Sequence, residues 1–350
     1  MLQLGAGLIL LLLGAELMVR AAVRLAASFH VRPLIIGLSV VALGSSAPQM
    51  AVSLQAAFNA APDIAVGSVF GSNIFNVLVT LGLCALIIPL RVSRQLVRLD
   101  IPLMIAASAL VYGLALNQTI GRLEGAVLLM GLGGYCYLLV RQSRHHGRPH
   151  ARAHTPARPG PAPWLSTVLL AVAGLGLLIW AGHLILDAAV ELATDYGFSD
   201  RIIGLTIVAV CTSLPELATS LIAAIRGERE IAVGNVVGSN LFNLLGVLGL
   251  TAVIAPAPLS VSPNALDFDL PVMLGVAVLC LPLFYSGYRI TRAEGLVLLG
   301  LFTAYGLHVI TFTTGMALAG RLEHLMLFYV LPVLALFVLV STLHAWRRQH

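Results

Sequence analysis

The sequence contains no lysine and has little charge of either sign. Charged residues make up 10% of the 350 positions and aromatic residues 7%, whereas 59% are apolar. So little polar surface cannot cover a water-soluble domain of this length, which excludes a soluble enzyme. Cysteine is also scarce, and the four that occur match no metal-ligand spacing. We expect each to be a small buried hydrophobic residue: Cys84, Cys136, Cys211 and Cys280.

Apolar runs of about twenty residues recur along nearly the whole chain, which is typical of membrane-spanning helices. The short alternating segments of transmembrane strands are absent from the sequence. The pattern predicts an all-α polytopic membrane protein, and the chain starts without the basic segment of a signal peptide. The eleven expected helices lie at about 3–28, 33–58, 64–90, 99–117, 122–141, 164–189, 201–225, 231–256, 268–288, 293–312 and 323–345.

The arginines predict the orientation of these helices. If the Arg- and His-rich segment 142–163 is cytoplasmic, all but three of the twenty arginines fall on the cytoplasmic side. Positive charge resists translocation, so we expect the N-terminus outside and the C-terminal "WRRQH" inside, in a cell (inner) membrane. The net charge of +5 then belongs to loops facing lipid headgroups, and nucleic acid is not an expected partner. The segment 142–163 itself has the composition of a flexible linker.

Two long stretches repeat with a constant offset of 167 residues. "IIGLSVVALGSSAPQMAVSL" begins at Ile35 and "IIGLTIVAVCTSLPELATSL" at Ile202, and the match continues without a gap through "GSVFGSNIFN" and "GNVVGSNLFN". Gly, Pro, Ser and Asn stay in register, which indicates an internal duplication. In the predicted topology the two copies have opposite orientations, an arrangement typical of transporters with a site at the membrane midplane. We therefore expect four regions: a first five-helix repeat at 1–141, a linker at 142–163, a second, inverted repeat at 164–312, and an extra helix and tail at 313–350.

Each copy carries a proline in the middle of a membrane helix. Pro48 and Pro215 remove a backbone donor and crowd the preceding turn, so each helix should kink or break and free carbonyl oxygens. Bare carbonyls are costly in lipid and must line a cavity or find a partner. Hydroxyl groups lie beside both predicted breaks, on Ser45, Ser46, Thr212 and Ser213.

The helix that follows each proline has closely spaced glycines. These glycines allow close helix packing, and they are Gly67, Gly71, Gly234 and Gly238. The packing should bring further polar side chains to the breaks, on Ser72, Asn76, Ser239 and Asn243. The expected result is an oxygen-lined pocket with one acid, Glu216, and hard cations such as Na⁺ and Ca²⁺ prefer oxygen ligands. At the position equivalent to Glu216, the first copy has Gln49.

The duplicated "TSLPE" and "GNVVGSNLFN" motifs resemble the alpha-repeats of the calcium/cation antiporter superfamily, which includes the sodium/calcium exchangers. The resemblance implies an antiporter, not an enzyme, that exchanges Na⁺, or sometimes H⁺ or K⁺, against Ca²⁺ by alternating access. We expect no cofactor and a monomeric transport unit. It implies metal ligands at Glu216, Ser46, Ser213, Ser72 and Ser239. It also implies contributions from Ser45, Thr212, Asn76, Asn243 and the backbone carbonyls of Ala42 and Ala209.

Gln49 stands where the resemblance implies a second glutamate. Ca²⁺ bound beside Glu216 alone would keep an uncompensated positive charge, whereas a single Na⁺ or H⁺ would be neutralised. Three functions remain open on the sequence: Na⁺/Ca²⁺ antiport, exchange restricted to monovalent cations, and a non-transporting sensor or scaffold. Glu16 could supply the missing carboxylate, but its spacing from Arg20 favours an ion pair within one helix.

Overall fold

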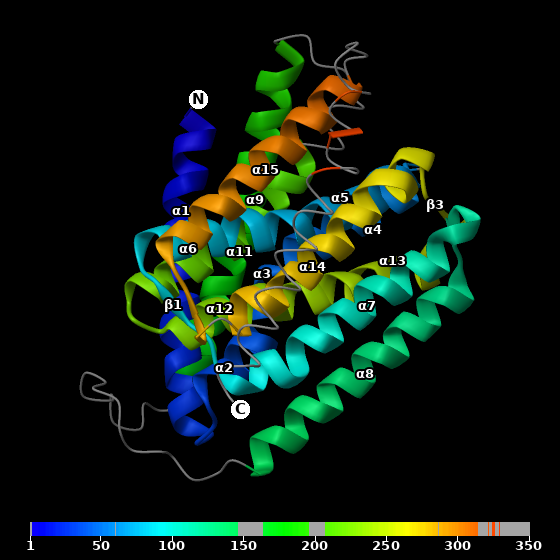
Figure 1. Ribbon diagram of the computed structural model, residues 1–350. Coiled ribbons are helices and arrows are strands. Elements are labelled where there is room, and N and C mark those ends of the chain that lie inside the picture. Colours follow the sequence, from blue (N-terminus) through cyan, green and yellow to red (C-terminus); the bar gives the residue numbers. More distant parts are fainter. Residues whose placement is uncertain are drawn as a thin grey trace.

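The computed structural model describes residues 2–59, 61–145, 164–195, 207–285 and 287–313, and the single positions 321, 324, 325 and 329. The described chain is almost entirely helical, and the helices form one bundle (Figure 1). Nine of its helices are long and apolar enough to span a membrane, and a bent pair forms a tenth candidate. The all-α prediction is confirmed. The predicted helix at 323–345 and most of the linker 142–163 lie outside the described residues.

The first half of the chain contains four of the candidate spans and the bent pair. Several are interrupted by π-helical turns, which often mark functional sites in membrane and soluble proteins. In order the elements are α1 (Leu2–Ser28), α2 (Pro33–Ile36), a π-helical turn (Gly37–Val41), α3 (Ala42–Ser45), α4 (Ala47–Phe58), α5 (Pro62–Phe75), a π-helical turn (Asn76–Leu81), α6 (Gly82–Ile87), β1 (Leu90–Arg91), a π-helical turn (Leu96–Asp100), α7 (Ile101–Leu114), a 3-10 turn (Ala115–Asn117), β2 (Thr119–Ile120) and α8 (Arg122–His145).

The second half repeats this order closely. Its elements are α9 (Trp164–Asp195), α11 (Val208–Ile225), α12 (Arg229–Leu241), a π-helical turn (Phe242–Val247), α13 (Leu248–Ile254), β3 (Leu259–Ser260), a π-helical turn (Ala265–Asp269), α14 (Leu270–Tyr285), β4 (Arg289–Ile290) and α15 (Arg292–Thr313). The π-helical turns at Asn76 and Phe242 fall at nearly equivalent positions of the two copies. The helices predicted from hydropathy are therefore present within the described residues, with ends shifted by a few residues.

Two short antiparallel ribbons join the halves. β1 pairs with β4, with Leu90 opposite Ile290, and β2 pairs with β3, with Ile120 opposite Leu259. α7 runs from the loop containing β1 to the loop containing β2, so the ribbons lie at opposite ends of that helix. Each ribbon takes one strand from each half: the first strand of the first half pairs with the second strand of the second half at one end of the bundle, and the other two strands pair at the other end.

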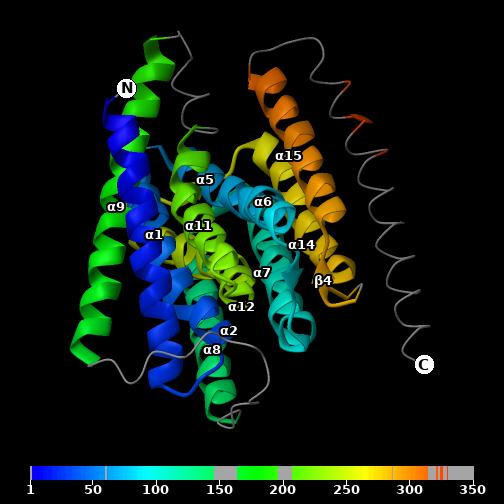
Figure 2. The same cartoon turned by 90° about the vertical axis from the view of Figure 1, so that its left-hand side faces the viewer.

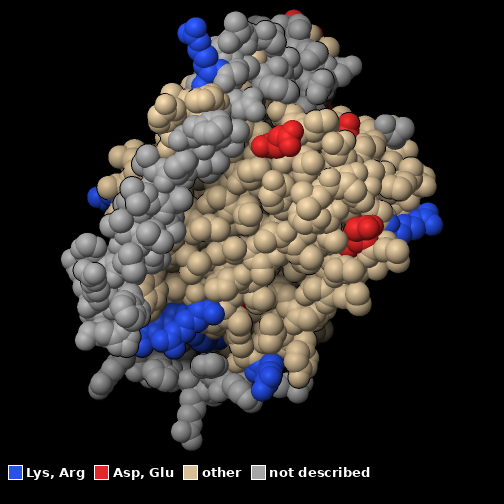
Figure 3. Space-filling view, turned by 45° about the vertical axis from the view of Figure 1, so that its right-hand side comes forward, with Lys and Arg blue, Asp and Glu red and all other residues tan. Residues whose placement is uncertain are grey.

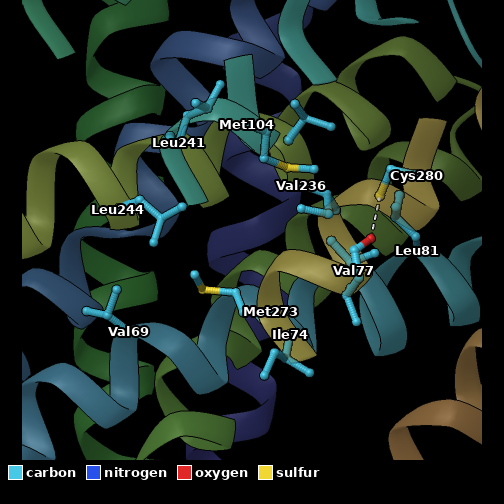
Figure 4. Packing of buried hydrophobic residues seen from close by; sticks show 14 of the residues in the cluster. Val69, Ile74, Val77, Leu81, Met104, Val236, Leu241, Leu244, Met273 and Cys280 are labelled. Atoms are coloured by element: carbon cyan, nitrogen blue, oxygen red, sulfur yellow. Dashed lines mark hydrogen bonds between the residues drawn. The ribbon is translucent and has the colours of Figure 1, made fainter. Parts of the chain in front are cut away.

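The centre of the bundle is formed by the span that contains α5 in the first half and the equivalent span that contains α12 in the second half. Within the spans Pro62–Ile87 and Arg229–Ile254, 83% of the most apolar window is buried, against 22% for Arg122–Ser143 and 17% for Arg292–Thr311. Figure 4 shows apolar side chains from these central helices packed with Met104 of α7 and Met273 of α14. The helices that carry the duplicated motifs are thus surrounded by the others.

The outer helices expose apolar side chains. On α8, Leu123, Met130 and Tyr137 recur every seven residues and are 81%, 69% and 66% exposed. Figure 3 shows a broad face of the molecule with few charged side chains, and the basic and acidic side chains that are visible lie mostly towards its edges. Such a face is expected where lipid covers the protein. Cys136 also lies exposed on α8, so the prediction of a buried thiol is wrong there and holds for Cys84, Cys211 and Cys280.

α1 packs along the length of α9 (Figure 2). A Cβ placed on Gly14 would lie 3.0 Å from the carbonyl oxygen of Gly174, and the reverse distance is also 3.0 Å, so the backbones are nearly in contact. Glu16 of α1 forms an ion pair with Arg20, at 2.6 Å, and accepts a hydrogen bond of 2.7 Å from Nε of Arg226 at the end of α11. The predicted pairing of Glu16 with Arg20 is confirmed, and both carboxylate oxygens of Glu16 are engaged by arginines.

Three of the four predicted packing glycines lie against another helix. A Cβ would come within 2.9 Å of Ala209 Cβ at Gly71, 3.0 Å of the Leu34 carbonyl oxygen at Gly234, and 2.7 Å of the Leu38 carbonyl oxygen at Gly238. Gly67 is half-buried. Close packing therefore joins α12 to the segment from α2 to α3.

We expect Gly238→Ala to destabilise the protein by about 1–3 kcal/mol, because the new methyl group would overlap backbone atoms that cannot turn away. The thermal unfolding of the purified protein in detergent measures this. Gly176→Ala on α9 is the matched control, since a Cβ there meets nothing within 4 Å. An unfolding temperature of Gly238→Ala equal to that of the wild type would show that the helices can separate without cost.

Candidate functional site

The ten polar side chains predicted to line a pocket are all buried. They come from both halves, on α3 and α4, α5 and its π-helical turn, α11, and α12 and its π-helical turn. None is more than 3% exposed: Ser45, Ser46, Gln49, Ser72, Asn76, Thr212, Ser213, Glu216, Ser239 and Asn243. Burying so many polar groups inside an apolar bundle is costly unless they bind one another or a ligand.

The prolines affect the two copies differently. The helix breaks just before Pro48: α3 ends at Ser45 and α4 begins at Ala47. The segments Pro33–Ser45 and Ala47–Phe58 are bent by 41° relative to each other. Pro215 instead lies inside the continuous helix α11, so the predicted break is wrong there. Proline removes one helical hydrogen bond, which a helix can tolerate. In the preceding turn, the hydroxyls of Thr212 and Ser213 donate to the carbonyl oxygens of Val208 and Ala209, at 2.8 Å each.

Glu216 meets the first half of the chain at the break. The hydroxyl of Ser46 donates to Oε1 of Glu216 at 3.1 Å. The other carboxylate oxygen, Oε2, has no hydrogen-bond partner among the described residues. A buried carboxylate with a free oxygen is a strong ligand for a cation, since binding relieves the cost of its burial.

Gln49 is connected to the second half through Ser72. The Ser72 hydroxyl donates to Oε1 of Gln49 at 3.0 Å and lies 2.6 Å from the hydroxyl of Ser213. Ser213 donates to the carbonyl oxygen of Ala209 at 2.8 Å. The structure therefore places the Ala209 carbonyl beside hydroxyls from both halves.

The equivalent arrangement surrounds Ala42. The hydroxyls of Ser45 and Ser239 are 3.3 Å apart, and they lie 3.3 Å and 3.5 Å from the carbonyl oxygen of Ala42. Ser45 thus corresponds in place to Ser213, although the sequence offset pairs it with Thr212. Thr212 contacts its own helix backbone and is not linked across the halves by a described hydrogen bond.

Asn76 and Asn243 lie at the π-helical turns that follow α5 and α12. The Asn76 amide nitrogen donates to Oδ1 of Asn240 at 3.1 Å. Oδ1 of Asn76 and both polar atoms of the Asn243 side chain have no partner among the described residues. Three buried polar atoms are therefore available to a ligand or water.

Sequence reasoning missed three residues that hold the predicted ones. Asn235 accepts a hydrogen bond from Ser45 at 3.1 Å and donates to Ser220 at 2.9 Å. Ser53 and Ser68 accept hydrogen bonds from the amide nitrogen of Gln49. The signal was present, because Ser53 and Ser220 are equivalent, and Ser68 and Asn235 form a second polar mismatch between the copies.

A cavity of about 390 Å³ leads towards these groups. Its lining is apolar and includes Met18 of α1, Leu43 of α3 and Leu175 of α9, and it reaches Ser46. Ser46 thus lines the cavity and also donates a hydrogen bond to the carboxylate of Glu216.

The site offers oxygen ligands from hydroxyls, amides, two backbone carbonyls and one carboxylate. Within the described part of the chain, no group of three His, Cys, Asp or Glu side chains could hold a metal ion. Oxygen ligands of this kind, neutral except for one carboxylate, are those that hard cations prefer.

Known proteins resemble this chain over most of its length. A family model described as "Sodium/calcium exchanger protein" matches residues 1–141 and 166–311. Inner membrane protein YrbG of Escherichia coli is 36% identical over 277 residues, covering 78% of this chain and 85% of that protein. Sodium/calcium exchanger MaX1 of Methanosarcina acetivorans is 29% identical over 337 residues, covering 85% and 95%. A solved structure of the sodium-calcium exchanger NCX_Mj, soaked with Na⁺ and Ca²⁺, superposes with a TM-score of 0.72 at 29% identity and covers 86% of this chain and 95% of its own.

Proposed function

Because this chain belongs to the sodium/calcium exchanger family, and so is a multi-pass membrane antiporter, we propose that it exchanges Na⁺ (or H⁺) against Ca²⁺ or another cation at the site around Glu216. The observation that supports this most is the free Oε2 of Glu216, buried where helices of the two halves meet. In the proposed site, Glu216 and the hydroxyls of Ser46, Ser72, Ser213 and Ser239 bind the cation. The site works by alternating access and needs no cofactor.

The hydrogen bonds between the halves support alternating access. Ser46 bound to Glu216 and Ser72 beside Ser213 both join a first-half side chain to a second-half side chain. A cation that replaces these contacts would change the balance between the two conformations that open to either side, since a ligand shifts an equilibrium by its differential affinity. In this proposal residues 1–141 and 164–312 are the two inverted repeats, and one chain is a complete transport unit.

Exchange restricted to monovalent cations is the second candidate function. Gln49 favours it, because its side chain is neutral and its oxygen lies beside Ser72 at the position equivalent to Glu216. The charge of one carboxylate balances that of one Na⁺ or H⁺. Ca²⁺ would retain one unbalanced positive charge, and burying such a charge in a poorly hydrated pocket costs roughly several kcal/mol.

Ion flux into proteoliposomes, with Na⁺, Ca²⁺, K⁺ and pH varied one at a time, tests the proposal. We expect uptake of one cation that depends on an opposite gradient of another. Na⁺ flux driven by Ca²⁺ supports the first function, and Na⁺ flux driven only by pH supports the second. Absence of any coupled flux would contradict the proposal and leave a sensor or scaffold.

We expect single cysteines introduced at positions 150 and 344 to be labelled from the cytoplasmic side, and one at position 264 from the outside. This follows from the arginine distribution, because positively charged loops remain in the cytoplasm. The measurement uses a membrane-impermeant thiol reagent on intact and opened cells. The background must lack native cysteines, above all Cys136, which is exposed. Labelling of 150 and 264 from the same side would contradict the inverted repeat.

A further inference from the structure

The amide group of Gln49 is held at both ends. Its nitrogen, Nε2, donates to the hydroxyls of Ser68 at 2.9 Å and Ser53 at 3.2 Å, and its oxygen accepts from Ser72 at 3.0 Å. All four side chains are at most 1% exposed. The nitrogen is therefore turned towards Ser53 and Ser68, and the oxygen towards Ser72, whose hydroxyl lies 2.6 Å from that of Ser213 in the second half.

The two serines that face Nε2 act as hydrogen-bond acceptors. The hydroxyl of Ser68 donates to the carbonyl oxygen of Ala65 at 3.0 Å, and that of Ser53 lies 3.5 Å from the same oxygen. A hydroxyl that donates elsewhere has lone pairs left to accept, and an amide nitrogen has two hydrogens to give. An ionised carboxylate has none, so the hydroxyls in this orientation complement a glutamine at position 49, whereas a glutamate would require them to turn and donate.

In the second half, the amide that donates to the equivalent serine comes from a different position of the repeat. Ser220, the equivalent of Ser53, also accepts a hydrogen bond from an amide, but the amide belongs to Asn235, at 2.9 Å. Asn235 occupies the position equivalent to Ser68, and Glu216 the position equivalent to Gln49. Each half thus contains one amide that donates to the equivalent serine, from Gln49 to Ser53 in the first half and from Asn235 to Ser220 in the second. The two positions at which the copies differ in polar side chain therefore share this serine as a neighbour.

We propose that Ser53 and Ser68 are positioning residues that set the cation selectivity of the site by fixing the orientation of the Gln49 amide. With the nitrogen bound to both serines, the side chain presents a neutral oxygen to the pocket and keeps its N–H groups, which would repel a cation, turned away. The site then combines one carboxylate with one oriented neutral oxygen and suits a singly charged cation. This inference rests on the proposed function.

The test is a double-mutant cycle on the purified full-length protein, with Na⁺ binding measured by calorimetry. We expect Ser53→Ala/Ser68→Ala to weaken Na⁺ binding roughly five- to tenfold, the effect of losing an orienting hydrogen bond. In a Gln49→Ala background the same two changes should have no further effect, because the serines act through Gln49. Ser68→Thr retains the hydroxyl and should bind Na⁺ as the wild type does. Ser108→Ala is the matched control, since Ser108 is a buried serine that donates to its own helix, at 2.9 Å from the Met104 carbonyl oxygen.

Two results would overturn the inference. One is an unchanged Na⁺ affinity in Ser53→Ala/Ser68→Ala, and the other is an equal loss with and without Gln49, which would show a general packing effect. If wild-type protein binds no Na⁺ and Glu216→Gln changes nothing, the proposed function itself fails, and the inference fails with it.

A gain-of-function variant covers the case in which the alanine variant does not fold. Gln49→Glu/Ser68→Asn recreates in the first half the arrangement of Glu216, Asn235 and Ser220. We expect it to bind Ca²⁺ about tenfold more tightly than Gln49→Glu alone, because the hydroxyl of Ser53 can then accept a hydrogen bond from the new amide and no longer faces only a carboxylate oxygen. Equal Ca²⁺ affinities of the two variants would contradict the coupling of positions 49 and 68.

Discussion

We expect Glu216→Gln to abolish cation exchange while the protein still inserts and folds. Glu216 is the one carboxylate in either copy of the motif, and Ser46 holds it at the meeting of the two halves. Glutamine retains an oxygen but no charge, so a cation entering the pocket would lose its hydration without electrostatic compensation. A loss of several kcal/mol corresponds to a decrease in affinity of roughly a hundredfold or more.

Flux into proteoliposomes measures the effect, and gel filtration together with thermal unfolding shows whether the variant is folded. Glu191→Gln is the matched control, because Glu191 lies exposed on α9, away from the pocket. Wild-type flux should also fall in acid, since a protonated carboxyl offers no charge to the cation. Wild-type flux in Glu216→Gln would remove this residue from the mechanism.

We expect Gln49→Glu to increase Ca²⁺ affinity. A second carboxylate adds attraction that, at an effective dielectric constant of about 20, amounts to roughly 4 kcal/mol for two unit charges 4 Å apart. Dehydration of the new carboxylate and repulsion from Glu216 reduce the net gain to about 1–3 kcal/mol, or roughly five- to 150-fold. Because Ser53 and Ser68 are arranged to receive an amide, the gain should fall near the lower end.

Ca²⁺ binding and Ca²⁺-driven Na⁺ flux should be compared between wild type and variant under the same conditions. Gln55→Glu is a suitable control, because Gln55 lies on the same helix but is exposed. If the wild type already binds Ca²⁺ at micromolar concentration and Gln49→Glu changes nothing, the charge at position 49 does not determine selectivity.

The helices and the membership of the pocket could be predicted because both depend on strong local signals. Uninterrupted apolar runs fix the spans, and the two copies keep Gly, Pro, Ser and Asn in register. Glu216, Gln49 and the serines around them can therefore be identified as one group from the sequence alone.

The rest depends on contacts that no local pattern encodes. Strands of two residues, such as β1 and β4, are too short to produce a periodic signal, and their pairing joins Leu90 to Ile290. Pro215 and Pro48 occupy equivalent positions, yet among the described residues the helix breaks beside Pro48 and continues through Pro215. Ser53 and Ser68 looked like ordinary small residues of a membrane helix until the orientation of the Gln49 amide gave them a role.

The two ribbons also constrain the order in which the protein can be completed during synthesis. β1 emerges from the ribosome long before β4, and β2 before β3, so neither ribbon can close until most of the second half has been made. Contacts of such large sequence separation form late, since a long stretch of chain must be ordered first. Until β3 and β4 have been synthesised, the backbone groups of β1 and β2 therefore lack these partners, at opposite ends of α7. The two strands of the first half can therefore form their backbone pairs only after the strands of the second half have been synthesised.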